Sequence, residues 1–156
     1  MDRASRRIVG WSMSERKKAD LVCDTEKSAY WRRKPPAGVL VHTDRGSQYA
    51  SERHRRLLGD YQKVQSMSRK GNCWDSSAME SFFKTLKVEL VYPQRYATGA
   101  QARSDIVNWM ESFYNVRRLH SSIGYMAPVD AKWDLMAAWL DLRRNEARSE
   151  KVQRRT

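Results

Sequence analysis

The feature that most constrains the fold is a short apolar run at residues 38–44 (GVLVHTD), which ends at Asp44. Two prolines precede the run, and an Arg-Gly-Ser sequence turns the chain after it. A continuous apolar run of this length between turn signals predicts a strand buried on both faces, as in a parallel or mixed sheet. We therefore expect an α/β fold with a carboxylate at the end of a buried strand.

Further strands and amphipathic helices are predicted on either side of this run. β-branched and aromatic residues predict strands at 6–13 and, with looser alternation, at 61–68. Helical spacing and terminal signals predict helices at 19–34, 50–59, 75–91, 99–116 and 129–148. The length of 156 residues suits one main domain. We place this domain at 1–134, followed by a helix end and a charged tail at 135–156.

Some residues have specific predicted places in these helices. Gly59 suits the C′ position that ends the helix predicted around residues 50–59. Asp75 or Ser76 can cap the next helix. Apolar stripes at helical spacing predict the buried faces of the last three helices. These stripes are Met79, Phe82, Phe83, Leu86 and Leu90; Ile106, Trp109, Met110 and Phe113; and Trp133, Met136 and Leu140.

The charge balance predicts a polyanionic partner. The chain holds 30 Lys plus Arg against 18 Asp plus Glu, a formal net charge of +12. A domain this basic favours nucleic acid, although a solvated cationic surface kept for solubility would give the same composition. No apolar run approaches the roughly 20 residues that span a bilayer, and no signal peptide is evident. We expect a cytoplasmic protein without a membrane partner, in which Cys23 and Cys73 are free thiols.

Two carboxylates on different predicted elements suggest a metal site. Asp44 follows the apolar strand, and Glu80 lies on the helix predicted at 75–91, with 35 residues between them. Hard oxygen ligands of this kind suit Mg²⁺ or Mn²⁺, and a pair of such ions can catalyse phosphodiester chemistry. Spacing alone leaves two other roles open. Asp44 could cap the following helix, and Glu80 could pair with Lys84 one turn away.

Three segments in collinear order resemble one family. VHTDRGSQY, NCWDSSAMESFFKTLKVEL and FYNVRRLHSSIGYMAP resemble the transposases of the insertion-sequence three group, within the retroviral-integrase-like DDE superfamily. The resemblance covers residues 2 to about 134, and its pattern of HTDxGSQY followed by ESFFxxLKxE is specific. It implies an RNase-H-like integrase core with C-terminal helices, two divalent ions (Mg²⁺ or Mn²⁺), and DNA cleavage and strand transfer at transposon ends.

The resemblance assigns roles by matching position. Asp44 would be the second acidic metal ligand and Glu80 the third, both catalytic, and Lys87 matches the basic residue that the family uses to contact DNA near the site. His120 matches a family histidine and could shape its loop or touch DNA, while Trp74 could stack on a base or belong to the core. Further candidate DNA contacts are Lys84, Arg45, Arg69, Lys70, Arg117 and Arg118.

The sequence also departs from the family pattern. The first catalytic aspartate of the family lies on an opening strand that we expect to fall before Met1, so the core would lack its first strands. Asp2 lines up with a later turn and is not assigned as that ligand, and Ser76 replaces the usual asparagine. We expect a transposase fragment that is inactive alone and acts on transposon-end and target DNA, as a homo-oligomer or with full-length transposase.

Two readings from other classes remain open. The first is a non-catalytic nucleic-acid-binding remnant that associates with intact transposase or interferes with it. The second is a segment that does not fold alone.

Overall fold

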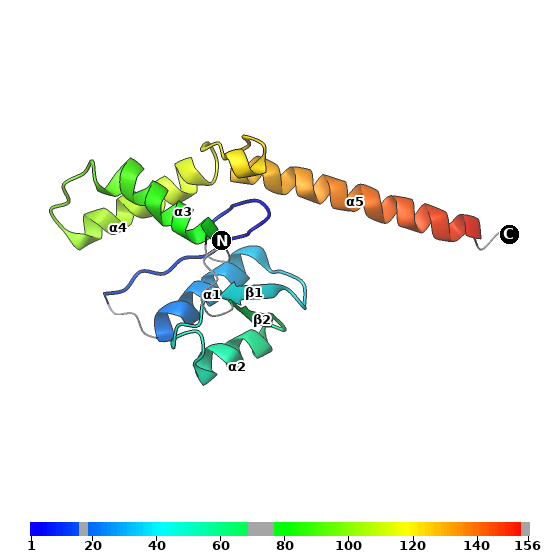
Figure 1. The fold of residues 1–156 in the computed structure, drawn as a ribbon, viewed down its shortest axis with the longest axis horizontal. Coiled ribbons are helices and arrows are strands. Elements are labelled where there is room, and N and C mark those ends of the chain that lie inside the picture. Colours follow the sequence, from blue (N-terminus) through cyan, green and yellow to red (C-terminus); the bar gives the residue numbers. More distant parts are fainter. Residues whose placement is uncertain (16–18, 69–76, 154–156) are drawn as a thin grey trace. The chain divides into compact units, whose positions relative to one another are not determined.

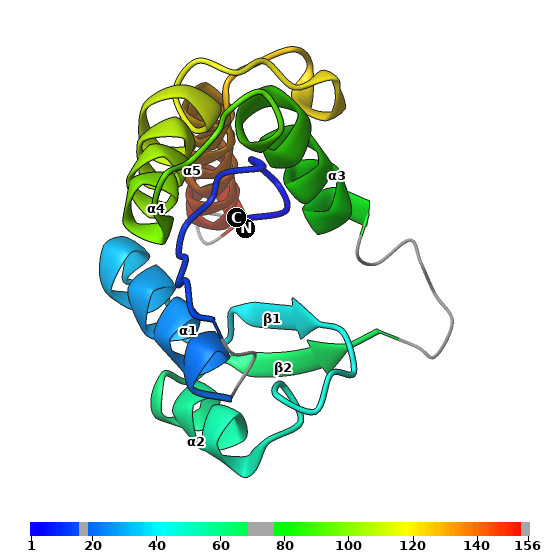
Figure 2. The same ribbon diagram turned by 90° about the vertical axis from the view of Figure 1, so that its left-hand side faces the viewer.

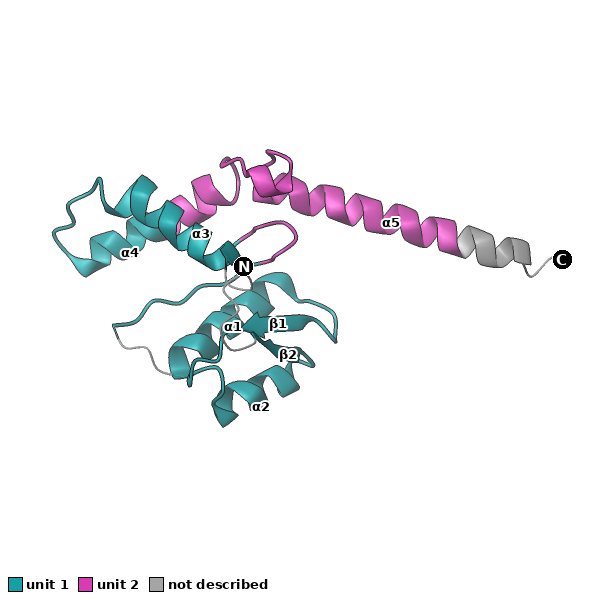
Figure 3. Ribbon diagram, in the orientation of Figure 1, with its two compact units in different colours: residues 1, 8–106 teal, residues 2–7, 107–156 magenta. Residues whose placement is uncertain are grey.

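A computed structural model describes residues 1–15, 19–68 and 77–153, with side chains described up to Glu146. The chain divides into two compact units (Figure 3). Unit 1 comprises Met1 and Ile8–Ile106, and unit 2 comprises Asp2–Arg7 and Val107–Thr156. The boundary expected after residue 134 falls within the last helix of unit 2 and stays a prediction.

Unit 1 contains a small parallel sheet (Figure 1). Its first elements are α1 (Ala19–Arg33), β1 (Leu40–Thr43), α2 (Glu52–Asp60) and β2 (Val64–Met67). β1 and β2 run parallel, as the two arrows in Figure 2 show. Leu40 is opposite Val64, and Thr43 is opposite Met67. Parallel strands need a crossover connection, which α2 provides, and this arrangement confirms the predicted α/β class.

Polar and aromatic contacts join α1 to the elements that follow it. Lys63 forms an ion pair with Glu26 in which both side chains are largely buried. The rings of Tyr30 and Tyr61 stack beside this pair, with centroids 3.8 Å apart and planes within 4°, and the Lys63 ammonium lies 5.5 Å from the Tyr30 ring centre. These contacts fix α1 against the segment that leads into β2.

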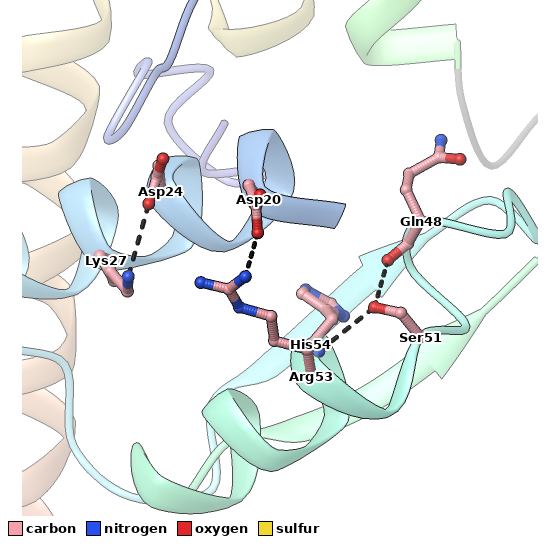
Figure 4. A network of polar contacts seen from close by, with 7 residues as sticks. All are labelled: Asp20, Asp24, Lys27, Gln48, Ser51, Arg53 and His54. Atoms are coloured by element: carbon pink, nitrogen blue, oxygen red, sulfur yellow. Dashed lines mark hydrogen bonds and ion pairs between the residues drawn. The ribbon is translucent and has the colours of Figure 1, made fainter. Parts of the chain in front are cut away.

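Two polar contacts position α2. Arg53 forms an ion pair with Asp20 of α1 (Figure 4), and the Ser51 hydroxyl caps α2 by accepting a hydrogen bond from the His54 amide. The predicted end at Gly59 is wrong, because the helix continues to Asp60. Its C-cap is Tyr61, and the left-handed residue that follows is Gln62, with φ of 52°.

The later elements of unit 1 are α3 (Ser77–Leu86), the π-helix η2 (Lys87–Val91) and most of α4 (Gly99–Asn108). Phe82 and Leu86 are buried, as the predicted stripe requires. Met79 and Phe83 of the same stripe are exposed. The buried face of α3 is therefore narrower than predicted.

Unit 2 contains the π-helix η3 (Trp109–Tyr114), the short 3₁₀ helix η4 (Ser121–Ile123) and α5 (Pro128–Gln153). Trp109 and Met110 are buried as predicted, but Phe113 is exposed and Tyr114 takes its place in the core. A π turn has more residues than an α turn, so it rotates the next side chains around the helix axis. The Val129 amide donates to the Asn115 carbonyl at 3.0 Å and ties α5 to η3.

Two predictions of strand structure are corrected. Residues 6–13 form no strand, and at Gly10 the backbone lies close to α1, where a side chain would be 2.5 Å from the Ala29 nitrogen. β1 is not buried on both faces, and Leu40 is 62% exposed. The sheet of the described residues has two strands, and the elements around it leave part of β1 exposed to solvent.

Other expectations have mixed outcomes. Cys23 is a free, buried thiol, and burial raises its pKa. Trp133, Met136 and Leu140 share a helix as predicted, but all three are exposed. In the part of the chain that the structure describes, no helix has the length and apolar character needed to cross a membrane.

Candidate metal and DNA site

Asp44 lies where the sequence predicts, immediately after the C-terminal end of β1, and it is exposed. Its Oδ1 accepts a hydrogen bond from the Gly46 amide at 2.8 Å. This bond closes the turn that leads toward α2, whereas the cap of α2 is Ser51. The alternative role of Asp44 as a helix cap is therefore wrong. The carboxylate is left at an open edge of the sheet.

Ser68 is bonded to the residues on both sides of Asp44. Its amide and its hydroxyl donate to the Thr43 carbonyl at 2.9 and 3.1 Å. The Arg45 Nε donates to the Ser68 carbonyl at 2.9 Å. Arg45 was predicted to contact DNA, and at least one of its donors is instead used to hold this turn.

His42 completes the contacts between the two strand ends. Its Nδ1 lies 3.0 Å from the Ser66 hydroxyl, and its Nε2 lies 3.3 Å from the Ser68 hydroxyl. Each ring nitrogen therefore lies within hydrogen-bond distance of one serine hydroxyl. Both strands are thereby linked through side chains as well as through the backbone.

The pKa of Tyr49 depends in part on the charge of Asp44. Burial raises the pKa of Tyr49, and the negative charge of Asp44 raises it further. The Tyr49 carbonyl accepts hydrogen bonds from His54 Nδ1 and Gln65 Nε2, at 3.1 and 2.9 Å. These contacts anchor the turn after Asp44 to α2 and β2.

Glu80 lies in the first turn of α3 and is exposed. The ion pairs of the described residues do not include one between Glu80 and Lys84, so the alternative pairing role is not seen. Lys84 is exposed in the same helix, and Lys87 is exposed at the first position of η2. π turns inside helices occur often at functional sites.

Each of the two carboxylates fits a divalent ion in chemical type. Carboxylate oxygens are hard donors that suit Mg²⁺ or Mn²⁺. Asp44 Oδ2 receives no hydrogen bond from the described residues, so this oxygen is available to an ion. Within residues 1–15, 19–68 and 77–153, no group of three or more His, Cys, Asp or Glu side chains could hold a metal.

The other residues predicted to contact DNA or to belong to the site lie in unit 2 or outside the described residues. Arg117 is exposed, whereas Arg118 is half-buried and its Nη1 lies 3.3 Å from His120 Nδ1. His120 is buried edge-on against the Tyr114 ring, with centroids 4.8 Å apart, which supports a structural role. The predicted sites that lie outside the described residues are Arg69, Lys70, Cys73, Trp74, Asp75 and Ser76.

Asp2 also has a local role. Its Oδ1 accepts from the Ala4 amide at 3.1 Å, and its Oδ2 accepts from the Ser5 hydroxyl at 3.0 Å. Both oxygens are used within the first turn of the chain, in agreement with leaving Asp2 out of the metal ligands.

The sequence reasoning missed Ser68, His42 and Ser66 as neighbours of Asp44. Their contacts depend on the register that sets His42 opposite Ser66. The only sequence signal was the spacing of His42 and Asp44, two residues apart, because alternate residues of a strand share a face.

The chain is similar to integrase cores and to transposases. Two family profiles, each described as an integrase core domain, match residues 1–73 and 62–128. The transposase for insertion sequence element IS904 of Lactococcus lactis subsp. lactis (strain IL1403) is 45% identical over 130 residues, which are 83% of this chain and 51% of the relative. Transposase InsF for insertion sequence IS3A of Escherichia coli (strain K12) is 43% identical over 128 residues, which are 82% of this chain and 44% of the relative.

The α/β arrangement and both profiles define an integrase-core domain of the RNase-H-like class. The chain belongs to the integrase-core family, with the transposases of the insertion-sequence three group as its relatives. It spans about half the length of the curated relatives that it matches.

Proposed function

We propose that this chain takes part in DNA transposition, as a portion of a DDE transposase that cleaves and joins phosphodiester bonds at transposon ends. The observation that carries the proposal is the 45% and 43% identity to two insertion-sequence transposases over more than four-fifths of the chain. The net charge of +12 supports DNA as the partner. We place this activity in the cytoplasm, acting on transposon-end and target DNA.

In this proposal Asp44 and Glu80 are the metal-ligating catalytic carboxylates. Bound Mg²⁺ or Mn²⁺ would activate the attacking oxygen and stabilise the leaving oxygen. Asp44 presents Oδ2 beyond the end of β1, and Glu80 presents its carboxylate from the exposed first turn of α3. Lys84 and Lys87 would bind DNA phosphates and so position the strand without reading its sequence.

The basic residues farther from the carboxylates would add to this phosphate binding. Arg45 keeps its terminal nitrogens for DNA while its Nε holds the turn, and Arg117 is exposed in unit 2. Arg118 would contribute less, because part of its guanidinium faces His120 and the Leu119 carbonyl. Arg69 and Lys70 stay predicted contacts.

A second candidate is a non-catalytic DNA-binding role in association with full-length transposase or a second copy of the chain. The observation that favours it is the net charge of +12, which suits DNA binding with or without a complete catalytic site. Two carboxylates should hold two divalent ions more weakly than three. The basic character supports DNA binding under both candidates.

A strand-transfer assay tests the non-catalytic candidate. The chain is incubated with transposon-end duplex and Mg²⁺ or Mn²⁺, next to its Asp44→Ala variant. We expect DNA binding but no joined product from either protein, because the described residues offer only two ligands. Joined product from the unmodified chain that disappears in Asp44→Ala would show a complete site. It would reject the non-catalytic candidate.

Salt dependence tests the DNA-binding part of the proposal. Phosphate contacts release counterions, so affinity should fall steeply as salt rises from about 50 to 200 mM. Lys87→Ala should weaken binding to all sequences alike and reduce the salt slope by about 1, whereas Lys27→Ala, which removes an ion-paired cation on α1, should change the slope less. No binding even at low salt would overturn both candidates.

A further inference from the structure

We infer that Ser68 is the positioning residue for the Asp44 carboxylate, an inference that rests on the proposed metal role of Asp44. Ser68 contacts Thr43 and Arg45, the residues before and after Asp44, through its amide, hydroxyl and carbonyl groups. It is buried, so its bonds are protected from competition with water.

The arrangement restrains Asp44 from both sides. On the strand side, the Thr43 carbonyl accepts two hydrogen bonds from Ser68, at 2.9 Å from the amide and 3.1 Å from the hydroxyl. On the turn side, Arg45 returns to the Ser68 carbonyl at 2.9 Å. The carbonyl before Asp44 and the side chain after it are therefore both bonded to Ser68, the residue that follows β2.

The carboxylate itself is fixed by a further bond within the turn. Gly46 donates to Asp44 Oδ1, which directs Oδ2 away from the turn. A side chain at Gly46 would come within 2.9 Å of Oδ1, so the close approach depends on glycine. Ser68 holds the backbone of this turn, and Gly46 then orients the carboxylate on it.

Such indirect contacts have large effects at metal sites. Groups that orient a ligand typically change metal affinity by about 10- to 100-fold when they are removed. Ser66 provides a matched comparison, because its hydroxyl lies on the same strand and contacts His42 at 3.0 Å. Its hydroxyl belongs to the same network of side chains, and it is bonded to His42 instead of to a neighbour of Asp44.

A variant of Arg45 provides a second test, because electrostatics and positioning predict opposite changes in cation affinity. By electrostatics alone, removing a positive charge next to Asp44 should tighten the binding of a cation. If Arg45 acts through its bond to Ser68, the variant Arg45→Met should bind the cation more weakly instead. Arg55→Met removes an exposed positive charge from α2 and serves as the matched control.

The experiment is a Mn²⁺ titration of the ¹⁵N-labelled 156-residue chain, which follows paramagnetic broadening of the Asp44 and Gly46 amide signals. We expect Ser68→Ala to weaken Mn²⁺ binding about tenfold, while Ser66→Ala and the hydroxyl-retaining Ser68→Thr stay within about twofold. Arg45→Met should also weaken binding. Unchanged affinity in Ser68→Ala, or an equal loss in Ser66→Ala, would overturn the inference.

Backbone relaxation separates this inference from the proposed function. If the unmodified chain shows no broadening at Asp44, the metal role of Asp44 fails. Positioning is then judged by the order parameter of the Asp44 amide, which should fall from about 0.85 toward 0.6 in Ser68→Ala and stay unchanged in Ser66→Ala. An unchanged order parameter in both variants would overturn the positioning role independently of any metal.

Discussion

The two proposed metal ligands lie in regions of very different construction. Asp44 follows a strand whose end is bonded to Ser68, and a buried ion pair and a tyrosine stack fix the segment before the partner strand β2 against α1. Glu80 is exposed on α3, and the buried residues Phe82 and Leu86 of the same helix provide its packing contacts. The position of Asp44 therefore depends on directional polar contacts, and that of Glu80 on the packing of one helix face.

This difference shows how one site can be only partly preorganised. Hydrogen bonds on both sides of Asp44 restrict its backbone before any ligand arrives, whereas Glu80 keeps the freedom of an exposed side chain. Preorganised groups lower the cost of binding, because less freedom is lost when the ligand arrives. We expect Asp44 to contribute its ligand oxygen at lower entropic cost than Glu80.

The largest expected effect is on the segment that leads into β2, the partner strand of β1. Lys63→Met should lower the free energy of unfolding by about 4 kcal/mol, because it leaves the Glu26 charge buried without its partner. Lys27→Met is the control, since the Lys27–Asp24 pair is exposed and should change stability by about 0.5 kcal/mol. Urea denaturation measures both. Equal effects would show that the two regions do not differ in this way.

The next effect concerns the helix that carries Glu80. Phe82→Ala should lower the free energy of unfolding by about 3 kcal/mol, because it removes a buried ring. The neighbouring Phe83 is 48% exposed, so Phe83→Ala should cost clearly less. Chemical denaturation of both variants checks the assignment of the buried face of α3. A larger loss in Phe83→Ala would contradict it.

A smaller effect is expected at the start of α2. Ser51→Ala removes the hydroxyl that caps the helix and should cost about 1 kcal/mol. Ser47→Ala, in the exposed part of the preceding turn, should be nearly neutral. Thermal unfolding followed by circular dichroism distinguishes the two. A neutral Ser51→Ala would mean that the cap does not stabilise α2.

The smallest effect concerns pH. Asp44→Asn should lower the pKa of Tyr49, because it removes the second cause of that raised pKa, while burial continues to raise it. As the pH rises through about 10, the unfolded chain loses the tyrosine proton before the folded chain does, so stability falls. This fall should be smaller in Asp44→Asn. Because the chain has seven tyrosines, a pH titration of the Tyr49 ring signals by NMR checks the shift, and an unchanged pKa would place the two groups too far apart to interact.

The sequence predicted the local elements of unit 1 better than their packing. The helix at 19–34 and the strand ending at Thr43 were found because prolines and a Gly-containing turn mark their ends. The burial of β1 was wrong, because it depends on how many strands and helices cover the sheet. Phe113 and Tyr114 exchanged places because a π turn is not visible in helical spacing.

The candidate site was predictable only at its two carboxylates. Asp44 and Glu80 were found through family resemblance, and the structure places them at a strand end and in a first helical turn. Ser68 and the buried Lys63 were missed, because cross-strand register and the burial of a charge are properties of the folded chain. Their roles depend on partners distant in the sequence.

The most direct test of the account compares Mn²⁺ binding at both carboxylates in one titration of the unmodified chain. Broadening of the Asp44 and Glu80 amide signals should follow the same binding curve, and Asp44→Asn should weaken the effect at both residues. Separate curves for the two residues, or broadening at Glu80 that persists unchanged in Asp44→Asn, would contradict a shared metal site.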